Sequence, residues 1–173
     1  MQVKLKEIAN IQFGYYGQPS KDGTIPYLQA KHFNEFGQFI GDNDAFLKED
    51  SKAIGSLLQD GDVLFVAKGF RFFATLYKEE FGKAIASSIF FILRPNKTRV
   101  IPAYLVSVLN LPKNLLHFQQ SGAGSSIPSI RKNELATVRA GSRDHPLFSR
   151  KDQTFPAPGA VLFYCDVFLL VDL

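Results

Sequence analysis

The segment from Ala84 to Leu93 most constrains the fold, because its alternate positions, read as an extended chain, form one mostly hydrophobic face. Successive side chains of an extended backbone point to opposite faces, so this alternation predicts a β-strand. One face of that strand would carry Ile85, Ser87, Ile89, Phe91 and Leu93.

Shorter strands are predicted over residues 11–16 and 72–77, and over the buried run 63–66 that follows a tight turn at 59–62. Residues 25–30 contain Pro26, which favours an edge strand. Helices are expected as a short turn over residues 3–9, from Pro102 to Leu109, and over residues 113–119. These elements do not alternate strictly. They therefore predict a single α+β domain with a twisted, mostly antiparallel sheet and a few short helices.

The chain has 173 residues, of which 46% are hydrophobic and 21% charged, as expected for one folded domain with a sizeable core. Its formal net charge is +4. Residues 1–140 hold 17 basic against 12 acidic side chains, a balance of +5, whereas residues 141–173 hold 3 against 4, a balance of −1. This mild basic bias permits a nucleic-acid partner without requiring one.

The single cysteine, Cys165, excludes an intrachain disulfide and a cysteine zinc site, which fits a reducing compartment. Residues 1–7 lack the apolar segment of a secretory signal. The longest apolar run, residues 160–171, contains Asp166 and is too short to span a bilayer. We therefore expect a cytoplasmic protein without a membrane partner.

Residue patterns typical of catalysis are not found in the sequence. The three histidines, His32, His117 and His145, lack the spacing of metal ligands. Glu80 and Lys83 have the wrong spacing for a nuclease metal site. No nucleotide-binding Gly-Lys-Ser/Thr follows the glycines of residues 122–126, and no Gly-x-Ser-x-Gly is present. We expect a non-catalytic protein without a bound metal or cofactor.

The segment from Ser121 to Leu135 combines a small, flexible loop with two bases at the start of an expected helix. Glycine and serine allow backbone N–H groups to approach an anion, and Arg131 and Lys132 add positive charge where the helix dipole also favours anions. The arrangement suits a phosphate contact. The alternative is an ordinary junction between a loop and a helix, with solvated bases.

Three segments together resemble the target recognition domain of a type I restriction–modification specificity (S) subunit. Residues 5–14, Leu-Lys-Glu-Ile-Ala-Asn-Ile-Gln-Phe-Gly, are similar to its opening, and residues 61–69, Gly-Asp-Val-Leu-Phe-Val-Ala-Lys-Gly, to its Gly-Asp-Val/Ile-Leu strand. Residues 121–130, followed by Lys132 and Leu135, resemble its closing loop and helix. Their order and spacing over about 135 residues carry the resemblance.

The resemblance implies a DNA-binding module that reads one half of a bipartite target. It implies double-stranded DNA, an adenine methyltransferase (M) subunit and a translocating endonuclease (R) subunit as partners. S-adenosylmethionine and ATP with magnesium would bind those partners rather than this domain.

The chain departs from the family pattern after Val138. The family would continue with a proline-rich segment and a long spacer helix, but residues 139–158 contain Gly141 and three prolines and keep no helical period. We therefore divide the chain into a DNA target recognition domain, residues 1–138, and an atypical tail, residues 139–173, that lacks the spacer. Our hypothesis is that a frameshift or gene rearrangement produced this tail.

Within the resemblance, DNA-contact residues fall into two groups. The candidate phosphate contacts are Lys31, Lys68, Ser125, Arg131 and Lys132. The candidate base readers, in polar and aromatic loops, are Tyr15, Tyr16, Gln18, Lys21, Gln29, His32 and Arg71. For each residue the alternative is a solvated or packing role. Core positions are expected instead for Phe65, Phe72, Phe73, Phe90 and Phe91.

Two other function classes stay open. A non-catalytic interaction or assembly module could self-associate, as a homodimer for example, by adding a strand from the apolar tail, residues 160–173. A nuclease would require metal-dependent cleavage by the isolated chain.

Overall fold

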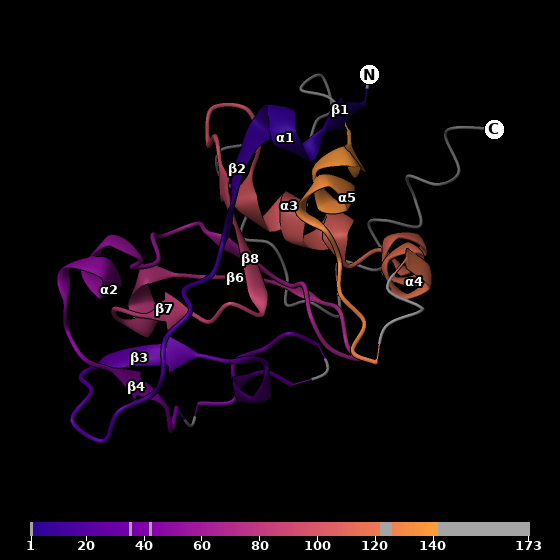
Figure 1. The fold of residues 1–173 in the computed structure, drawn as a ribbon. Coiled ribbons are helices and arrows are strands. Elements are labelled where there is room, and N and C mark those ends of the chain that lie inside the picture. The colour runs from indigo at the N-terminus through magenta and orange to yellow at the C-terminus, as the bar shows by residue number, and fades with distance from the viewer. Residues whose placement is uncertain (1, 35, 42, 122–125, 142–173) are drawn as a thin grey trace.

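The centre of the molecule is a four-stranded antiparallel sheet with the strand order β2-β8-β5-β6. A computed structural model describes residues 2–34, 36–41, 43–121 and 126–141. The strands are β2 (Ala9–Phe13), β8 (Phe90–Pro95), β5 (Val63–Val66) and β6 (Ala74–Leu76). Figure 1 shows this sheet between a group of helices on one side and a smaller sheet on the other.

Both faces of the central sheet are buried. Four helices cover one face: α1 (Leu5–Ile8), α3 (Pro102–Leu109), α4 (Pro112–Ser121) and α5 (Lys132–Thr137). On the other face, Leu64 and Phe90 pack with Phe33 and Tyr77. Because neither face meets water, β5 is a continuous apolar run rather than an alternating one.

A second, three-stranded sheet lies beside the first and has the order β4-β3-β7. Its strands are β4 (Phe46–Leu47), β3 (Ile25–Leu28) and β7 (Ile85–Ala86), and β3 runs parallel to β7. Helix α2 (Ser51–Gly55) packs against it through Ala53. The Asp50 carboxylate caps α2 by accepting the Ala53 N–H at 2.7 Å.

The remaining elements are short. Two 3₁₀ turns, η1 (Ala30–His32) and η2 (Glu79–Phe81), follow β3 and β6. Strand β1 (Val3–Lys4) pairs with β9 (Arg139–Ala140). The Gly141 N–H donates to the Tyr104 hydroxyl on α3 at 2.8 Å. Because residues 142–173 lie outside the described residues, the proposed division at residue 138 stays a prediction.

The α+β fold predicted from the sequence is confirmed, and α3 begins and ends at the expected residues. The second predicted helix extends over Pro112–Ser121, and the strand expected over residues 11–16 occupies Ala9–Phe13 as β2. All five phenylalanines assigned to the core are buried, namely Phe65, Phe72, Phe73, Phe90 and Phe91.

The expectation of one strand over Ala84–Leu93 is wrong. A turn at residues 87–89 divides the segment into β7 and β8, which belong to different sheets. The Phe90 N–H donates to the Ser87 carbonyl at 3.0 Å and closes this turn. Ser87 and Ser88 favour a turn, while the alternating pattern continues across it.

The expectation of an edge strand at Pro26 is also wrong, because β3 is the middle strand of its sheet. Pro26 pairs with Phe46 of β4, whereas β7 pairs only with Tyr27 and Leu28. The proline therefore lies where no ladder hydrogen bond toward β7 is needed.

The turn before β5 is fixed by a buried carboxylate. Asp62 is only 1% exposed and accepts two hydrogen bonds from the Arg94 guanidinium, both at 2.8 Å, and one from the Gln59 N–H at 2.9 Å. The Asp62 carboxylate holds the pKa of Arg94 above its ordinary value. Gly61 adopts a φ of +86°, which favours glycine at this turn. The Gly-Asp motif thus orders the turn and the sheet.

Candidate nucleic-acid interface

Three loops leave the same end of the central sheet. In the antiparallel register, Phe13 at the end of β2 pairs with Phe91 near the start of β8, and Val66 at the end of β5 pairs with Phe90. Strand β6 begins opposite Phe65. The segments 14–16, 67–73 and 87–89 therefore emerge together, whereas residues 17–20 continue toward the start of β3, where the Ser20 N–H donates to the Phe46 carbonyl at 2.8 Å.

A fourth segment, residues 126–132, lies against the loop that follows β5. The Ile130 N–H donates to the Ala67 carbonyl at 2.8 Å, and the Gly69 N–H donates to the Pro128 carbonyl at 3.0 Å. Lys68 and Ser129 form an antiparallel bridge between these bonds. We call the four segments, residues 14–16, 67–73, 87–89 and 126–132, the loop end.

The turn at residues 87–89 anchors the first loop. The Tyr15 N–H donates to the Ala86 carbonyl at 2.8 Å, and the Tyr15 carbonyl accepts the Tyr27 hydroxyl at 2.8 Å. A Cβ added to Gly14 would lie 2.0 Å from the Ser87 carbonyl oxygen, so only glycine allows this approach. Tyr15 is half-buried, whereas Tyr16 is 81% exposed.

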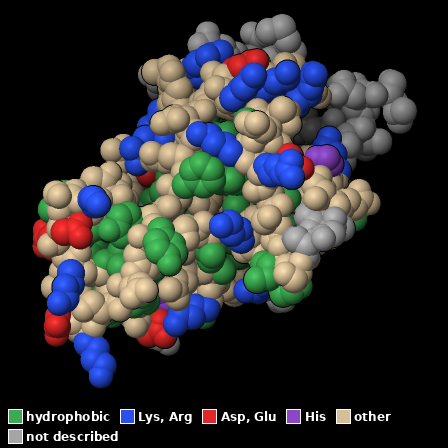
Figure 2. Space-filling model, viewed as in Figure 1, with side chains coloured by type: hydrophobic (Ala, Val, Ile, Leu, Met, Phe, Trp, Pro, Cys, Tyr) green, Lys and Arg blue, Asp and Glu red, His purple; other side chains and the backbone are tan. Residues whose placement is uncertain are grey.

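The loop end carries an excess of positive charge, although the Glu134 carboxylate just beyond it accepts the Arg131 backbone N–H at 2.8 Å. Its four segments contain Lys68, Arg71, Arg131 and Lys132 but no aspartate or glutamate, a formal balance of +4. All four bases are exposed, and none forms an ion pair within the described part of the chain. Figure 2 shows lysines and arginines distributed over one face of the molecule, with hydrophobic side chains between them. Such a surface suits a polyanion.

Aromatic side chains stand among these bases. The Lys132 ammonium lies 5.9 Å from the centre of the Phe13 ring, a cation–π contact. Phe13 is 66% exposed and Phe70, between Lys68 and Arg71, is 77% exposed. Sequence reasoning missed both phenylalanines. An available signal was the position of Phe70 within a basic, glycine-containing loop, where a core role was not to be expected.

The end of β3 leads to the same turn. Because β3 and β7 are parallel, both finish at one edge, and the Ser87 N–H donates to the Leu28 carbonyl at 2.9 Å. Gln29 follows immediately, is half-buried, and begins the segment that contains Lys31 and His32. These three residues thus adjoin the loop end.

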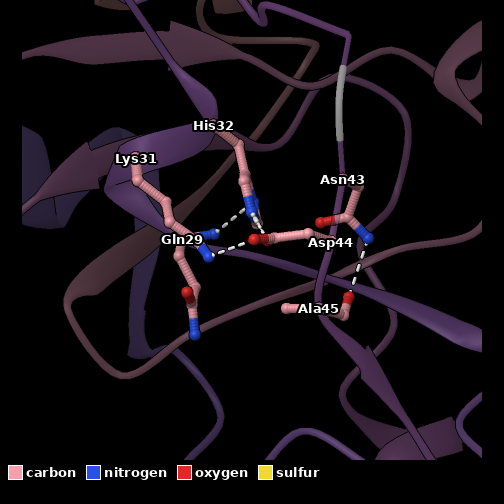
Figure 3. Close-up of polar contacts among 6 residues, drawn as sticks. All are labelled: Gln29, Lys31, His32, Asn43, Asp44 and Ala45. Atoms are coloured by element: carbon pink, nitrogen blue, oxygen red, sulfur yellow. Dashed lines mark hydrogen bonds and ion pairs between the residues drawn. The ribbon is translucent and has the colours of Figure 1, made fainter. Parts of the chain in front are cut away.

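Figure 3 shows how Asp44 joins this segment to a distant part of the chain. The His32 ring is 2% exposed; its Nδ1 accepts the Gln29 N–H at 3.1 Å, so its Nε2–H donates to Asp44 Oδ1 at 2.9 Å. Lys31 Nζ donates to Asp44 Oδ2 at 2.6 Å. The hydrogen bonds from Lys31 and His32 lower the pKa of Asp44 to about 2. His32 therefore orders the backbone that presents Gln29.

The predicted contact residues are distributed as follows. The loop end contains Tyr15, Tyr16, Lys68, Arg71, Arg131 and Lys132, and Gln29, Lys31 and His32 adjoin it; Gln18 lies between the loop end and the turn at Ser20. Lys21 lies at the opposite end of the second sheet, where the Gly23 N–H and Ser20 carbonyl close a turn before β3 begins. Ser125 lies outside the described residues.

Over the described ranges, no three His, Cys, Asp or Glu side chains lie close enough to hold a metal ion. Within these same residues, no helix is long and apolar enough to cross a membrane. Cys165 and His145 lie outside them.

Two solved structures of type I restriction–modification systems share this fold. The chain superposes on the S subunit from M. genitalium with a TM-score of 0.53 and 12% identity, over 80% of this chain and 33% of that one. A chain from a structure describing complex assembly and conformational transition of the type I system gives a TM-score of 0.62 and 15% identity, over 99% and 42% of the respective chains. No family model and no curated protein matches the sequence.

At these identities the comparisons show a shared fold. The resemblance to a target recognition domain of a type I S subunit is confirmed at this level. The chain spans about a third to two-fifths of the length of the two chains it matches.

Proposed function

We propose that this chain is a DNA target recognition domain of a type I restriction–modification S subunit. The observation that carries the proposal is the loop end, where four exposed bases without acidic partners surround exposed aromatic side chains on an S-subunit fold. Cations bind phosphates without regard to sequence, and side chains between them read base edges.

The residues have separate roles in this proposal. Lys68, Arg131 and Lys132 bind phosphates and fix the register of the domain on the duplex. Arg71 and Gln29 have the donor geometry for guanine and adenine, respectively, and read bases in the major groove. Tyr16 contributes an exposed ring beside them. His32 and Tyr15 act by positioning, because the first is buried and the second is held by backbone hydrogen bonds.

The domain directs other subunits rather than acting on DNA itself. In this proposal it recognises one half-site of a bipartite target and brings an adenine methyltransferase subunit and an endonuclease subunit to that DNA. S-adenosylmethionine, ATP and magnesium serve those partners, and the chain acts in the cytoplasm. Self-association through residues 160–173 stays a prediction, since that segment lies outside the described residues.

Fluorescence anisotropy of the full chain with a pool of random duplex DNA, at several salt concentrations, tests the proposal. We expect binding that weakens steeply with salt. Replacing Lys68, Arg71, Arg131 and Lys132 by alanine should make the slope of log K against log salt shallower by about 3, because each of the three phosphate contacts among them contributes about 0.9.

A charge-matched control removes four exposed lysines outside the loop end, namely Lys21, Lys52, Lys83 and Lys113. Both variants lose the same formal charge, so long-range attraction falls similarly in each. If the slope of log K against log salt became as shallow in the control variant as in the loop-end variant, the assignment of the binding site to the loop end would be contradicted. Absence of binding by the unaltered chain at low salt, together with concentration-dependent oligomers in sedimentation, would favour the assembly module instead.

A further inference from the structure

Phe70 is a large apolar side chain held in water at the tip of the loop that joins β5 and β6. It is 77% exposed, and Lys68 and Arg71 lie on either side of it in the sequence. Gly69 has a φ of +134°, a conformation that side-chain-bearing residues rarely adopt, and this backbone sets the path into Phe70. Neither composition nor packing explains an aromatic residue here.

The base of this loop is fixed on both sides. Residues 67–69 are hydrogen-bonded to residues 128–130. On the other side, Phe72 is buried and its ring lies parallel to that of Phe65, with centroids 6.4 Å apart. Phe73 is buried against the opposite face of the sheet. The core positions next to Phe70 are therefore already filled, and the loop holds this ring outward.

The charge around the ring indicates the kind of surface it meets. The segments of the loop end contain four bases and no carboxylate, which disfavours a basic or neutral protein groove and fits the paired phosphate backbones of a duplex. Proteins that contact DNA through Arg and Lys also use apolar side chains such as Phe to enter the stack of bases.

We propose that Phe70 is a wedge that inserts between two adjacent base pairs of the bound duplex. Lys68 binds the phosphate beside the opened step, Arg71 reads a base next to it, and the hydrogen bonds between residues 67–69 and 128–130 keep the loop in place. The inference rests on the proposed DNA-binding function and adds a local unstacking of DNA to it. Flexible pyrimidine–purine steps open at the least cost, so the wedge also favours such a step in the target.

Duplexes carrying a single 2-aminopurine, moved one position at a time along a sequence selected for binding, test the wedge. Unstacking raises the fluorescence of this base. We expect the chain to raise fluorescence at one step only. Phe70→Ala should abolish the rise and weaken binding by about tenfold, while the salt dependence is kept because the cations remain. Phe70→Leu, which keeps an apolar wedge, should retain most of the rise.

The control variant is Phe36→Ala. Phe36 is also an exposed phenylalanine, at 66%, but it lies in the 34–38 turn, outside the loop end. It should leave fluorescence and affinity unchanged. Binding by the unaltered chain without any fluorescence rise, or an equal rise with Phe70→Ala, would overturn the wedge and leave the recognition domain standing. No binding by the unaltered chain would overturn both.

Discussion

Removal of the Asp62 carboxylate should destabilise the domain far more than its size suggests. Asp62 is 1% exposed and accepts three hydrogen bonds: two from Arg94 and one from the Gln59 N–H. In Asp62→Ala the Gln59 N–H loses its acceptor and the Arg94 guanidinium loses its counter-ion. The Gln59 N–H and the Arg94 guanidinium both meet Asp62 at the turn before β5, so the loss of their partner destabilises the central sheet.

The expected magnitude follows from the burial of the two partners. Breaking a buried ion pair by removing one partner costs about 3–5 kcal/mol. Because the Arg94 side chain is 33% exposed, water can solvate part of the freed guanidinium and reduce that figure. An unsatisfied N–H adds about 1 kcal/mol or more. We expect a loss of about 2–4 kcal/mol in the free energy of unfolding.

Urea denaturation followed by circular dichroism measures this loss, and Asp60→Ala is the matched control. Asp60 lies two residues away in the same turn and pairs with Lys97 at 3.2 Å, but its side chain is 55% exposed. Exposed pairs contribute little, so the control should cost less than about 1 kcal/mol. If the two variants were equally stable, the buried carboxylate would not be what holds the turn.

Three further perturbations test the site and its support. Arg71→Ala should cost about 1–3 kcal/mol of binding to the selected sequence and little on random DNA, as measured by anisotropy; equal losses would make Arg71 a phosphate contact. The pKa of Asp44 lies at about 2 against an ordinary 3.8, so the stability that Asp44 contributes is complete above about pH 4 and is lost as the pH falls toward 2. Lys31→Ala should raise the pKa of Asp44 toward 3.8 in a carbon-detected NMR titration, and an unchanged value would refute the role of that lysine. Gly14→Ala should destabilise the domain in thermal melts by more than about 1 kcal/mol, because the added Cβ collides with a backbone carbonyl. Gly55→Ala should not destabilise the domain, because nothing lies within 4 Å of a Cβ added there. Equal losses of stability in the two variants would show that the collision at Gly14 is not the cause.

The helices and the buried strands were predictable because their signals are local. Pro102 marks the start of α3, and the unbroken apolar run of β5 follows a Gly-Asp turn. The division of Ala84–Leu93 was not predictable, because residue alternation is compatible with either one strand or two. The hydrogen bond from the Ser87 N–H to the carbonyl of Leu28, which is distant in sequence, fixes where the turn lies. Likewise, the central position of β3 was not predictable, because it depends on pairing with β4 at Pro26 and with β7 at Tyr27 and Leu28.

The candidate site divides in the same way. Basic and polar loops could be identified one at a time, but their convergence depends on strand register and on the bonds between residues 67–69 and 128–130. His32 lies in a polar loop but is buried, and its ring is hydrogen-bonded to Asp44, twelve residues later in the chain. Phe70 was missed because phenylalanine is usually a core residue, although its position in a basic, glycine-containing loop argued against that role.

The central claim is that the loop end recognises a DNA sequence. The most direct measurement is selection of binding sites by the full chain from a pool of random duplexes, repeated with the variant that lacks Lys68, Arg71, Arg131 and Lys132. We predict that the unaltered chain enriches one short sequence and that the variant enriches none. Equal enrichment by both would move recognition away from the loop end, and no enrichment by the unaltered chain would contradict sequence-specific recognition.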